Sequence, residues 1–413
     1  FDPGRRFRYE DWMPWSNVAY KQWLTQLNGL RSPREEVTMR MRKAPSFIVS
    51  FFTVLPLALF LAAGVTWAAE KALPLPSEKV SAAAKAKGYA GAQACAECHI
   101  NKYNDYRASG HPKKLRPAAE AQAWGIPLPE GYEWDDISYV IGGANWKARF
   151  VGKDGYIITK TGEKKDQPGK NQYNLATGRW VNYHGGEKKP YNCGRCHTTG
   201  YSKEGHQGGL PGIVGTWAFP GITCEECHGP GAAHSKEPSK ENIKVDKSPA
   251  ACGKCHIRGT KEKIPAKGGF IRHHEQYNEY LAGPHAALKK LGCATCHDPH
   301  KRAEVSITKQ CQACHPKQGK QFKGSKMQKS GITCVDCHMP PAGKSAEKFA
   351  KYVADVKSHI VKISTNPADK MFTEDGKFST GILTVDFACL RCHGARDMKW
   401  ALENSKNIHI LGK

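Results

Sequence analysis

The stretch Gly221-Ile-Thr-Cys-Glu-Glu-Cys-His228 contains the pattern that decides how this chain folds: two cysteines three positions apart, followed at once by a histidine. Eight copies of this pattern use all sixteen cysteines of the 413-residue chain. In chain order we call them the first to eighth motifs. Their cysteine pairs are Cys95 and Cys98, Cys193 and Cys196, Cys224 and Cys227, Cys252 and Cys255, Cys293 and Cys296, Cys311 and Cys314, Cys334 and Cys337, and Cys389 and Cys392. Their histidines are His99, His197, His228, His256, His297, His315, His338 and His393.

The pattern C-x-x-C-H is the attachment signature of c-type haem. Two thiols three positions apart can bond to one edge of a porphyrin, and the next histidine then binds the iron from below. Zinc sites and redox cysteine pairs do not require a histidine after the second cysteine, and a disulfide framework would not place every cysteine in such pairs. The sequence therefore predicts eight covalently attached haem c groups.

Eight irons need eight further axial ligands if every iron is six-coordinate. Ten histidines lie outside the motifs: His111, His184, His206, His234, His273, His274, His285, His300, His359 and His409. We expect all of them to be iron ligands except His206 and one of the adjacent pair His273 and His274. His206 lies in a loop rich in glycine, and ordering such a loop costs more backbone entropy.

The amino-terminal part of the chain resembles a secretory leader. Residues 39–68 contain, in this order, a basic start, an apolar run from Ser46 to Val65 and a small-residue cleavage site. This order is typical of a signal peptide. The run is also long enough to be a retained membrane anchor. We expect residues 1–38 to be an upstream or non-native extension, and residues 69–413 to form the octahaem domain.

About 43 residues per haem are too few for a conventional apolar core around each cofactor, as an estimate from typical composition. We therefore predict mostly coil with short α-helices wrapped around a stacked haem core. A small β element is expected near 138–183, where apolar and polar residues alternate around turn signals. The lysine-rich segments 233–270 and 317–330 are predicted as solvated loops, and 395–405 as a helical tail.

The formal charge of +24 first suggests a nucleic-acid partner. Each haem, however, brings two propionates, and buried charges need partners. Much of the lysine excess is then explained by the cofactors, and we exclude nucleic acid. A basic face for an acidic redox partner remains consistent with the composition.

Several stretches resemble the multihaem c-type cytochromes, in particular the cytochrome c554-like group. They are Tyr89 to His99, Ser109 to His111, Gly221 to His234, Cys293 to His300 and Asp355 to His359. More loosely, the chain is similar to extracellular cytochromes that polymerise into conductive filaments. The resemblance implies closely stacked haems with two histidine ligands each, and a role in electron transfer.

We therefore expect an exported electron-transfer protein, periplasmic or extracellular, rather than an enzyme. Its partners would be redox proteins or an extracellular electron acceptor, and contact with a membrane would occur only through an uncleaved leader. The alternative is an octahaem oxidoreductase that acts on a small nitrogen or sulfur compound at one five-coordinate haem. A third hypothesis is a homopolymer in which His111 or His409 ligates a haem of the next subunit.

Overall fold

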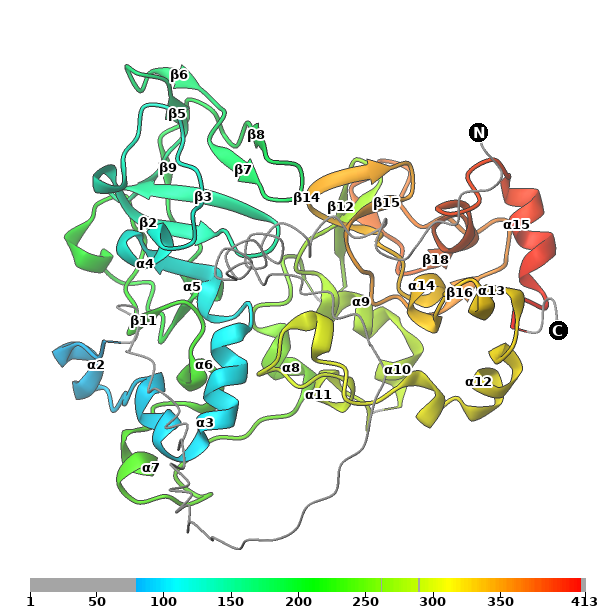
Figure 1. Cartoon of the computed structure of the whole chain (residues 1–413), viewed down its shortest axis with the longest axis horizontal. Coiled ribbons are helices and arrows are strands. Elements are labelled where there is room, and N and C mark those ends of the chain that lie inside the picture. Colours follow the sequence, from blue (N-terminus) through cyan, green and yellow to red (C-terminus); the bar gives the residue numbers. More distant parts are fainter. Residues whose placement is uncertain (1–78, 261, 289, 410–413) are drawn as a thin grey trace, which may run out of the picture. The chain divides into compact units, whose positions relative to one another are not determined.

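The computed structural model describes residues 79–260, 262–288 and 290–409. The predictions for the extension 1–38 and the leader 39–68 concern residues outside this part. The described chain combines short helices with several small sheets (Figure 1). Among its helices, none has the length and the apolar composition that crossing a membrane requires.

Most helices contain only one or two turns. The longest is α3 (Ala92–Ala108), and the others are α2 (Ala82–Ala86), α4 (Ala118–Gln122), α5 (Gly194–His197), α6 (Cys224–His228), α7 (Ala232–Lys236), α8 (Pro249–Gly253), α9 (Gln276–Ala282), α10 (Pro284–Ala287), α11 (Cys293–Cys296), α12 (Pro316–Phe322), α13 (Lys326–Lys329), α14 (Cys334–His338) and α15 (Met398–Ser405). Single 3₁₀ turns are η3 (Pro112–Lys114), η4 (Trp134–Asp136), η5 (Gln207–Gly209), η6 (Ala303–Val305) and η7 (Cys311–Ala313), and η8 (Asp386–Leu390) is a π-helical turn.

The first sheet confirms the β element predicted near 138–183 and extends it on both sides. Its strands are β1 (Leu115–Pro117), β2 (Ile137–Gly142), β3 (Lys147–Gly152), β4 (Tyr156–Ile157) and β9 (Lys189–Pro190), with β7 (Gln172–Asn174) between β3 and β8 (Arg179–Val181). All its pairings are antiparallel. The turn between β2 and β3 needs Gly143, because its φ is 76° and a Cβ there would lie 2.5 Å from the Ile126 side chain.

A second sheet, which the sequence analysis does not anticipate, lies in the carboxyl-terminal third. Its order is β15 (Val353–Val356), β14 (Gly343–Ala350), β13 (Phe270–Arg272), β12 (Ile264–Lys267) and β17 (Phe378–Ser379), and β13 and β14 are parallel. Three two-stranded ladders complete the strands: β5 (Lys160–Thr161) with β6 (Gln167–Pro168), β10 (Thr198–Thr199) with β11 (Phe219–Pro220), and β16 (Ile363–Ser364) with β18 (Leu383–Thr384).

The buried side chain of Glu347 connects the two larger sheets. Its carboxylate, on β14, accepts hydrogen bonds from Asn174 at 2.9 Å and Thr177 at 2.6 Å, and Arg179 donates to it at 2.7 Å. Trp146 adds a second link through its indole N–H, which donates to the Asp355 carbonyl at 3.0 Å. The two sheets are therefore joined by polar contacts.

Three of the apolar clusters lie on these sheets, and two smaller ones lie beside motifs, one on α3 at the first motif and one around Cys389 of the eighth. Phe150 and Val140 belong to one cluster of the first sheet, and Phe270 and Ile271 to the cluster of the second. Of the described residues between Tyr277 and Ala342, Pro340 is the one buried aliphatic or aromatic side chain. This stretch contains three motifs, so its folding cannot rest on an apolar core made by the chain alone.

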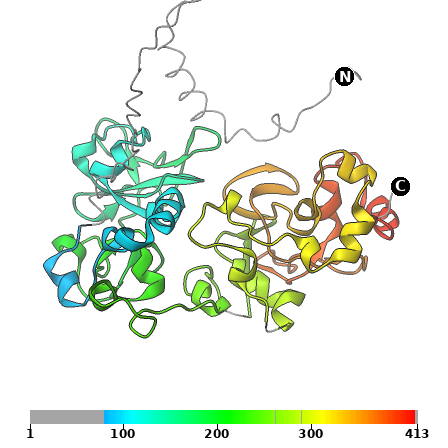
Figure 2. The same cartoon turned by 60° about the horizontal axis from the view of Figure 1, so that its bottom comes forward.

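Two segments predicted as solvated loops contain regular structure, and that prediction is wrong. Segment 233–270 includes α8 and β12, and segment 317–330 consists largely of α12 and α13, part of the yellow region in Figure 2. Prolines at the first position of α8 and α12 fit a helix start, and the Ser325 hydroxyl caps α13. The loop prediction was based on the lysine content of both segments and did not use these helix-capping residues. The predicted tail helix is confirmed as α15.

Candidate functional site

The motifs lie on short helices or turns. The eight elements are α3, α5, α6, the end of α8, α11, η7, α14 and η8. In a helical turn, residues three positions apart lie on the same face, so the two thiols of a motif point to the same side. This local geometry is what attachment to one porphyrin edge requires.

All sixteen thiols are free, and none forms a disulfide. Nor do the described residues contain any group of three or more His, Cys, Asp or Glu side chains that could share a metal ion. The protein ligands alone therefore do not build a zinc site here. A metal held by two histidines and a porphyrin needs no such cluster.

Six of the eight motif histidines face a second histidine. The ring centroids are separated by 6.4 Å for His99 and His234, 6.5 Å for His256 and His111, 6.2 Å for His228 and His300, 6.2 Å for His297 and His359, 6.1 Å for His315 and His285, and 6.1 Å for His338 and His409. Two imidazoles that bind one metal from opposite sides, each with a nitrogen at about 2.0–2.1 Å, have centroids roughly 6 Å apart. The residues therefore fit a haem iron between each pair.

Several of these rings are oriented through Nδ1. His228 is 2.7 Å from the Lys244 carbonyl and His338 is 2.8 Å from the Val361 carbonyl. His300 is 2.7 Å from the Asp298 carboxylate. Such a contact fixes the tautomer with the proton on Nδ1 and leaves Nε2 for a metal. These second partners hold the rings ready for an axial role.

Burial keeps two of the distal rings neutral. It lowers the pKa of His111 to about 4, with a further contribution from His256. It also lowers the pKa of His359 to about 4, with a further contribution from His297. A neutral imidazole is the form that binds a metal, so both rings are ready to do so at neutral pH.

Comparison with known proteins points to the same class as the motifs do, the multihaem c-type cytochromes. Residues 160–229, which contain the second and third motifs, match the family model of cytochrome c554 and c-prime. Over 167 residues the chain is 25% identical to the multiheme cytochrome MtrA of Shewanella baltica, which covers 36% of this chain and 45% of that protein. The chain thus spans about half the length of this relative.

Two solved structures share the fold. The outer cell wall cytochrome OcwA matches with a TM-score of 0.53 and 21% identity, over 76% of this chain and 86% of that one. The octaheme sulfite reductase MccA of Wolinella succinogenes matches with a TM-score of 0.54 and 18% identity, over 73% of this chain and 65% of that one. The chain is a multihaem c-type cytochrome.

Two motif histidines of the cytochrome, His197 and His393, make no ring contact with a second imidazole among the described residues, although His274 lies within electrostatic range of His197. His197 is buried, and its Nδ1 has no hydrogen-bond partner. Burial, together with nearby Lys114 and Arg149, lowers the pKa of His197 to about 3. His393 contacts the Trp400 ring at 4.8 Å, which is closer than any of the six pairs.

The adjacent pair His273 and His274 lies close to the fourth motif. The ring of His274 is 6.2 Å from that of His256, whereas Nε2 of His273 accepts a hydrogen bond from the Arg258 guanidinium at 3.0 Å. His256 therefore has two neighbouring rings, His274 and His111, and one iron can take only one of them opposite His256. This choice was left open by the sequence, which predicted one ligand from the adjacent pair.

His184 and His206 are exposed and are not beside a motif histidine among the described ring contacts. Nδ1 of His184 lies 2.8 Å from the Glu187 carboxylate, and Nδ1 of His206 lies 2.6 Å from the Ile213 carbonyl. His184 was predicted as an axial ligand, and the structure does not bring it to an iron site of this chain.

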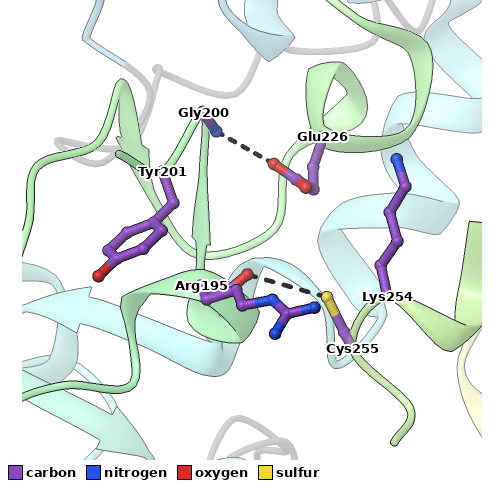
Figure 3. A pocket seen from close by; sticks show the side chains of 6 residues that line it. All are labelled: Arg195, Gly200, Tyr201, Glu226, Lys254 and Cys255. Carbon is purple, nitrogen blue, oxygen red and sulfur yellow. Dashed lines mark hydrogen bonds between the residues drawn. The ribbon is translucent and has the colours of Figure 1, made fainter. Parts of the chain in front are cut away.

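Three motifs of the cytochrome converge around one cavity. Its volume is about 280 Å³, and Arg195 of the second motif, Glu226 of the third and Lys254 of the fourth line it (Figure 3). Here the Cys255 thiol lies 3.9 Å from the Arg195 carbonyl. The second and fourth motifs are therefore direct neighbours, which their distance in sequence does not reveal.

Other contacts place further motifs side by side. The third motif touches the first through Glu225, whose carboxylate accepts from the backbone of Ala90 and Gly91. The eighth touches the seventh through Arg391, which donates to the Asp336 carbonyl at 2.7 Å. Thiols of different motifs also meet: Cys95 of the first with Cys224 of the third, Cys196 of the second with Cys255 of the fourth, Cys252 of the fourth with Cys293 of the fifth, and Cys311 of the sixth with Cys334 of the seventh.

Proposed function

We propose that the protein transfers electrons along a series of eight covalently bound haems. The observation that carries this proposal is the set of six facing histidine pairs, each at the spacing of a doubly ligated iron. Haem iron supplies reversible one-electron chemistry, and two imidazole ligands leave it no position for a substrate. The residues of this chain hold the imidazole rings in position and shield them from solvent.

The contacts between motifs support a continuous series. They run from the first motif to the third, and from the fourth to the fifth, sixth, seventh and eighth in turn. The thiols of Cys227 and Cys252 lie within electrostatic range, which joins the third motif to the fourth. The second motif attaches beside the fourth through Arg195 and Cys255. It thus forms a branch, and the other seven form a line.

Two measurements test the electron-transfer function. Intact mass of the exported protein is expected to exceed that of the polypeptide by eight haem groups. Electron paramagnetic resonance of the oxidised protein is expected to show mainly low-spin iron, with reversible reduction by dithionite. A protein with bound haem in which most of the iron is high-spin would contradict the assignment of the six pairs.

The environment of His197 favours a second candidate function, an oxidoreductase acting on a small nitrogen or sulfur compound at the second motif. Among the described residues His197 makes no ring contact with a second imidazole, and His274, which lies within its electrostatic range, also lies 6.2 Å from His256. Lys114, Arg149 and Arg258 lie within electrostatic range of it and would attract a small anion. The fold shared with a protein described as an octaheme sulfite reductase is consistent with this candidate.

Ligand binding separates the two functions. If the second candidate is right, sulfite, nitrite or cyanide changes a high-spin ferric signal that accounts for one or two of the eight irons. Substituting Arg149→Gln weakens that anion binding, whereas the matched change Arg179→Gln does not, because Arg179 pairs with Glu347 and is not among the charges that act on His197. A native protein without high-spin iron would eliminate the catalytic candidate and leave electron transfer intact.

The periplasmic or extracellular location and the homopolymer are parts of the same proposal. Covalent haem c and the relatives named above as multiheme and outer cell wall cytochromes support an exported protein. His111 and His409 each face a motif histidine of their own chain, so we assign the proposed link between subunits to the exposed His184 instead. Negative-stain microscopy of secreted material tests for filaments.

A further inference from the structure

The surface around the sixth motif carries charge of one sign only. Between Glu304 and Asp336 the sequence contains no acidic residue. The same stretch contains six lysines, all exposed, which together we call the lysine surface: Lys309, Lys317, Lys320, Lys323, Lys326 and Lys329. A local charge of about +6 within 31 residues exceeds what the overall charge of the chain would place there by chance.

Two short helices arrange five of these lysines. Lys317 and Lys320 lie on α12, and Lys326 and Lys329 lie on α13, three positions apart in each case. Residues three apart share one face of a helix, so each helix presents its pair of lysines together. Lys323 follows the end of α12 directly. The spacing therefore concentrates charge instead of distributing it around the helices.

This surface surrounds the most exposed motif of the chain. Cys311, Cys314 and His315 are all exposed, and in the described part of the chain no other motif has both thiols and the histidine exposed. His315 still faces His285 at 6.1 Å, which is the spacing of a ligand pair. The sixth motif therefore combines a facing histidine pair with cysteines at the protein surface, and electron exchange with a second protein requires a haem near the surface.

We propose that the lysine surface docks an acidic redox protein, and that the sixth motif is the place where electrons pass between the two. The proposal rests on the electron-transfer function. Opposite charges on two redox proteins steer their encounter and raise the association rate, and the contacts of such transient pairs are small. Nucleic acid is disfavoured because the segment offers little aromatic surface for stacking, with Phe322 partly buried.

Charge reversal at matched sites tests the proposal. One variant combines Lys317→Glu, Lys323→Glu and Lys329→Glu on the lysine surface. The control combines Lys153→Glu, Lys164→Glu and Lys240→Glu, which are exposed lysines elsewhere and change the net charge equally. Both are prepared as holoproteins and checked for haem content and for reduction by dithionite.

The probe is mitochondrial-type cytochrome c made acidic by succinylation, and the readout is its rate of reduction in a stopped-flow instrument at several salt concentrations. We expect the first variant to react at least about tenfold more slowly at low salt, with little remaining salt dependence. The control is expected to stay within about twofold, since it leaves the local field intact. Equal losses in both variants, or none, would overturn the proposal.

Two further outcomes are decisive. If the lysine variant loses binding to vesicles of anionic lipid but keeps its rate with the acidic probe, the surface belongs to a membrane and the docking proposal is wrong. If neither the lysine-surface variant nor the control variant undergoes reversible haem reduction with dithionite, the electron-transfer function itself fails. This result appears before any partner is added. Failure of the docking site and failure of the function are thus separate observations.

Discussion

The buried carboxylate of Glu225, in the third motif, binds backbone groups beside the helix that carries the first motif. Oε1 of Glu225 accepts from the backbone N–H of Ala90 and of Gly231, each at 2.8 Å, and Oε2 accepts from Gly91 at 2.9 Å. Gly91 precedes α3, which carries the first motif, and Gly231 precedes α7, which carries His234. We predict that Glu225→Ala destabilises the protein and disturbs this iron site together.

The magnitude follows from the three hydrogen bonds. A hydrogen bond to a charged acceptor contributes about 1.5–3 kcal/mol, so three set an upper bound of roughly 5–9 kcal/mol. Water entering the space left by Glu225→Ala offsets part of this, and we expect a loss of about 3–5 kcal/mol in the free energy of unfolding. Glu226→Gln is the control, since this neighbour accepts one bond, from Gly200 at 3.0 Å, and the amide oxygen of Gln can still accept it, so we expect a cost of about 1 kcal/mol or less.

Guanidinium denaturation of holoproteins with equal haem content, followed by far-ultraviolet circular dichroism, measures the loss. Electron paramagnetic resonance is expected to show a new high-spin fraction in Glu225→Ala, because movement of α7 displaces His234 from the iron at His99. The reasoning is refuted if Glu225→Ala is no less stable than Glu226→Gln. Loss of stability without a spin change would refute only the claim that Glu225 positions His234, and the stability claim would stand.

Three other predictions follow from single contacts. His409→Ala should convert one low-spin iron to high-spin in resonance spectra, whereas His206→Ala should leave them unchanged; equal responses would count against the pairing. Burial alone would raise the pKa of Glu347, but its hydrogen bonds lower it overall, so its contribution is present above the unfolded pKa of about 4.3 and is lost on acidification. Glu347→Gln should therefore cost about 1–3 kcal/mol in urea denaturation at pH 7 and almost nothing near pH 3, and a cost independent of pH would contradict this. Gly221→Ala should lower the unfolding free energy by about 2–3 kcal/mol, because φ is 75° and the new Cβ would lie 2.3 Å from the Pro112 carbonyl; an unchanged melting temperature would argue against it.

The sequence predicts well what is encoded locally. The motif spacing is a local signal, and so is the alternation that marks β2 and β3. The helical tail expected at 395–405 is observed as α15 (Met398–Ser405). In each of these cases a few adjacent residues determine the outcome through backbone geometry and the period of burial.

Pairings between distant segments could not be predicted in this way. His111 follows the first motif but faces the histidine of the fourth, and His234 follows the third but faces that of the first. The second sheet was missed because β14 is largely polar and pairs with β13 across a long intervening segment. No local pattern contains the partner of such residues, so only the tertiary fold reveals it.

The stretch between Tyr277 and Ala342, in which Pro340 is the one buried aliphatic or aromatic side chain among the described residues, has a consequence for biogenesis. If haems are joined to the fifth, sixth and seventh motifs as proposed, the stable form of this stretch depends on them, and haem attachment becomes a step of folding. In the proposed exported protein, attachment would therefore act as a checkpoint. A chain that lacks haem in this stretch is expected to be cleared by proteases, instead of persisting as a cytochrome with fewer redox centres.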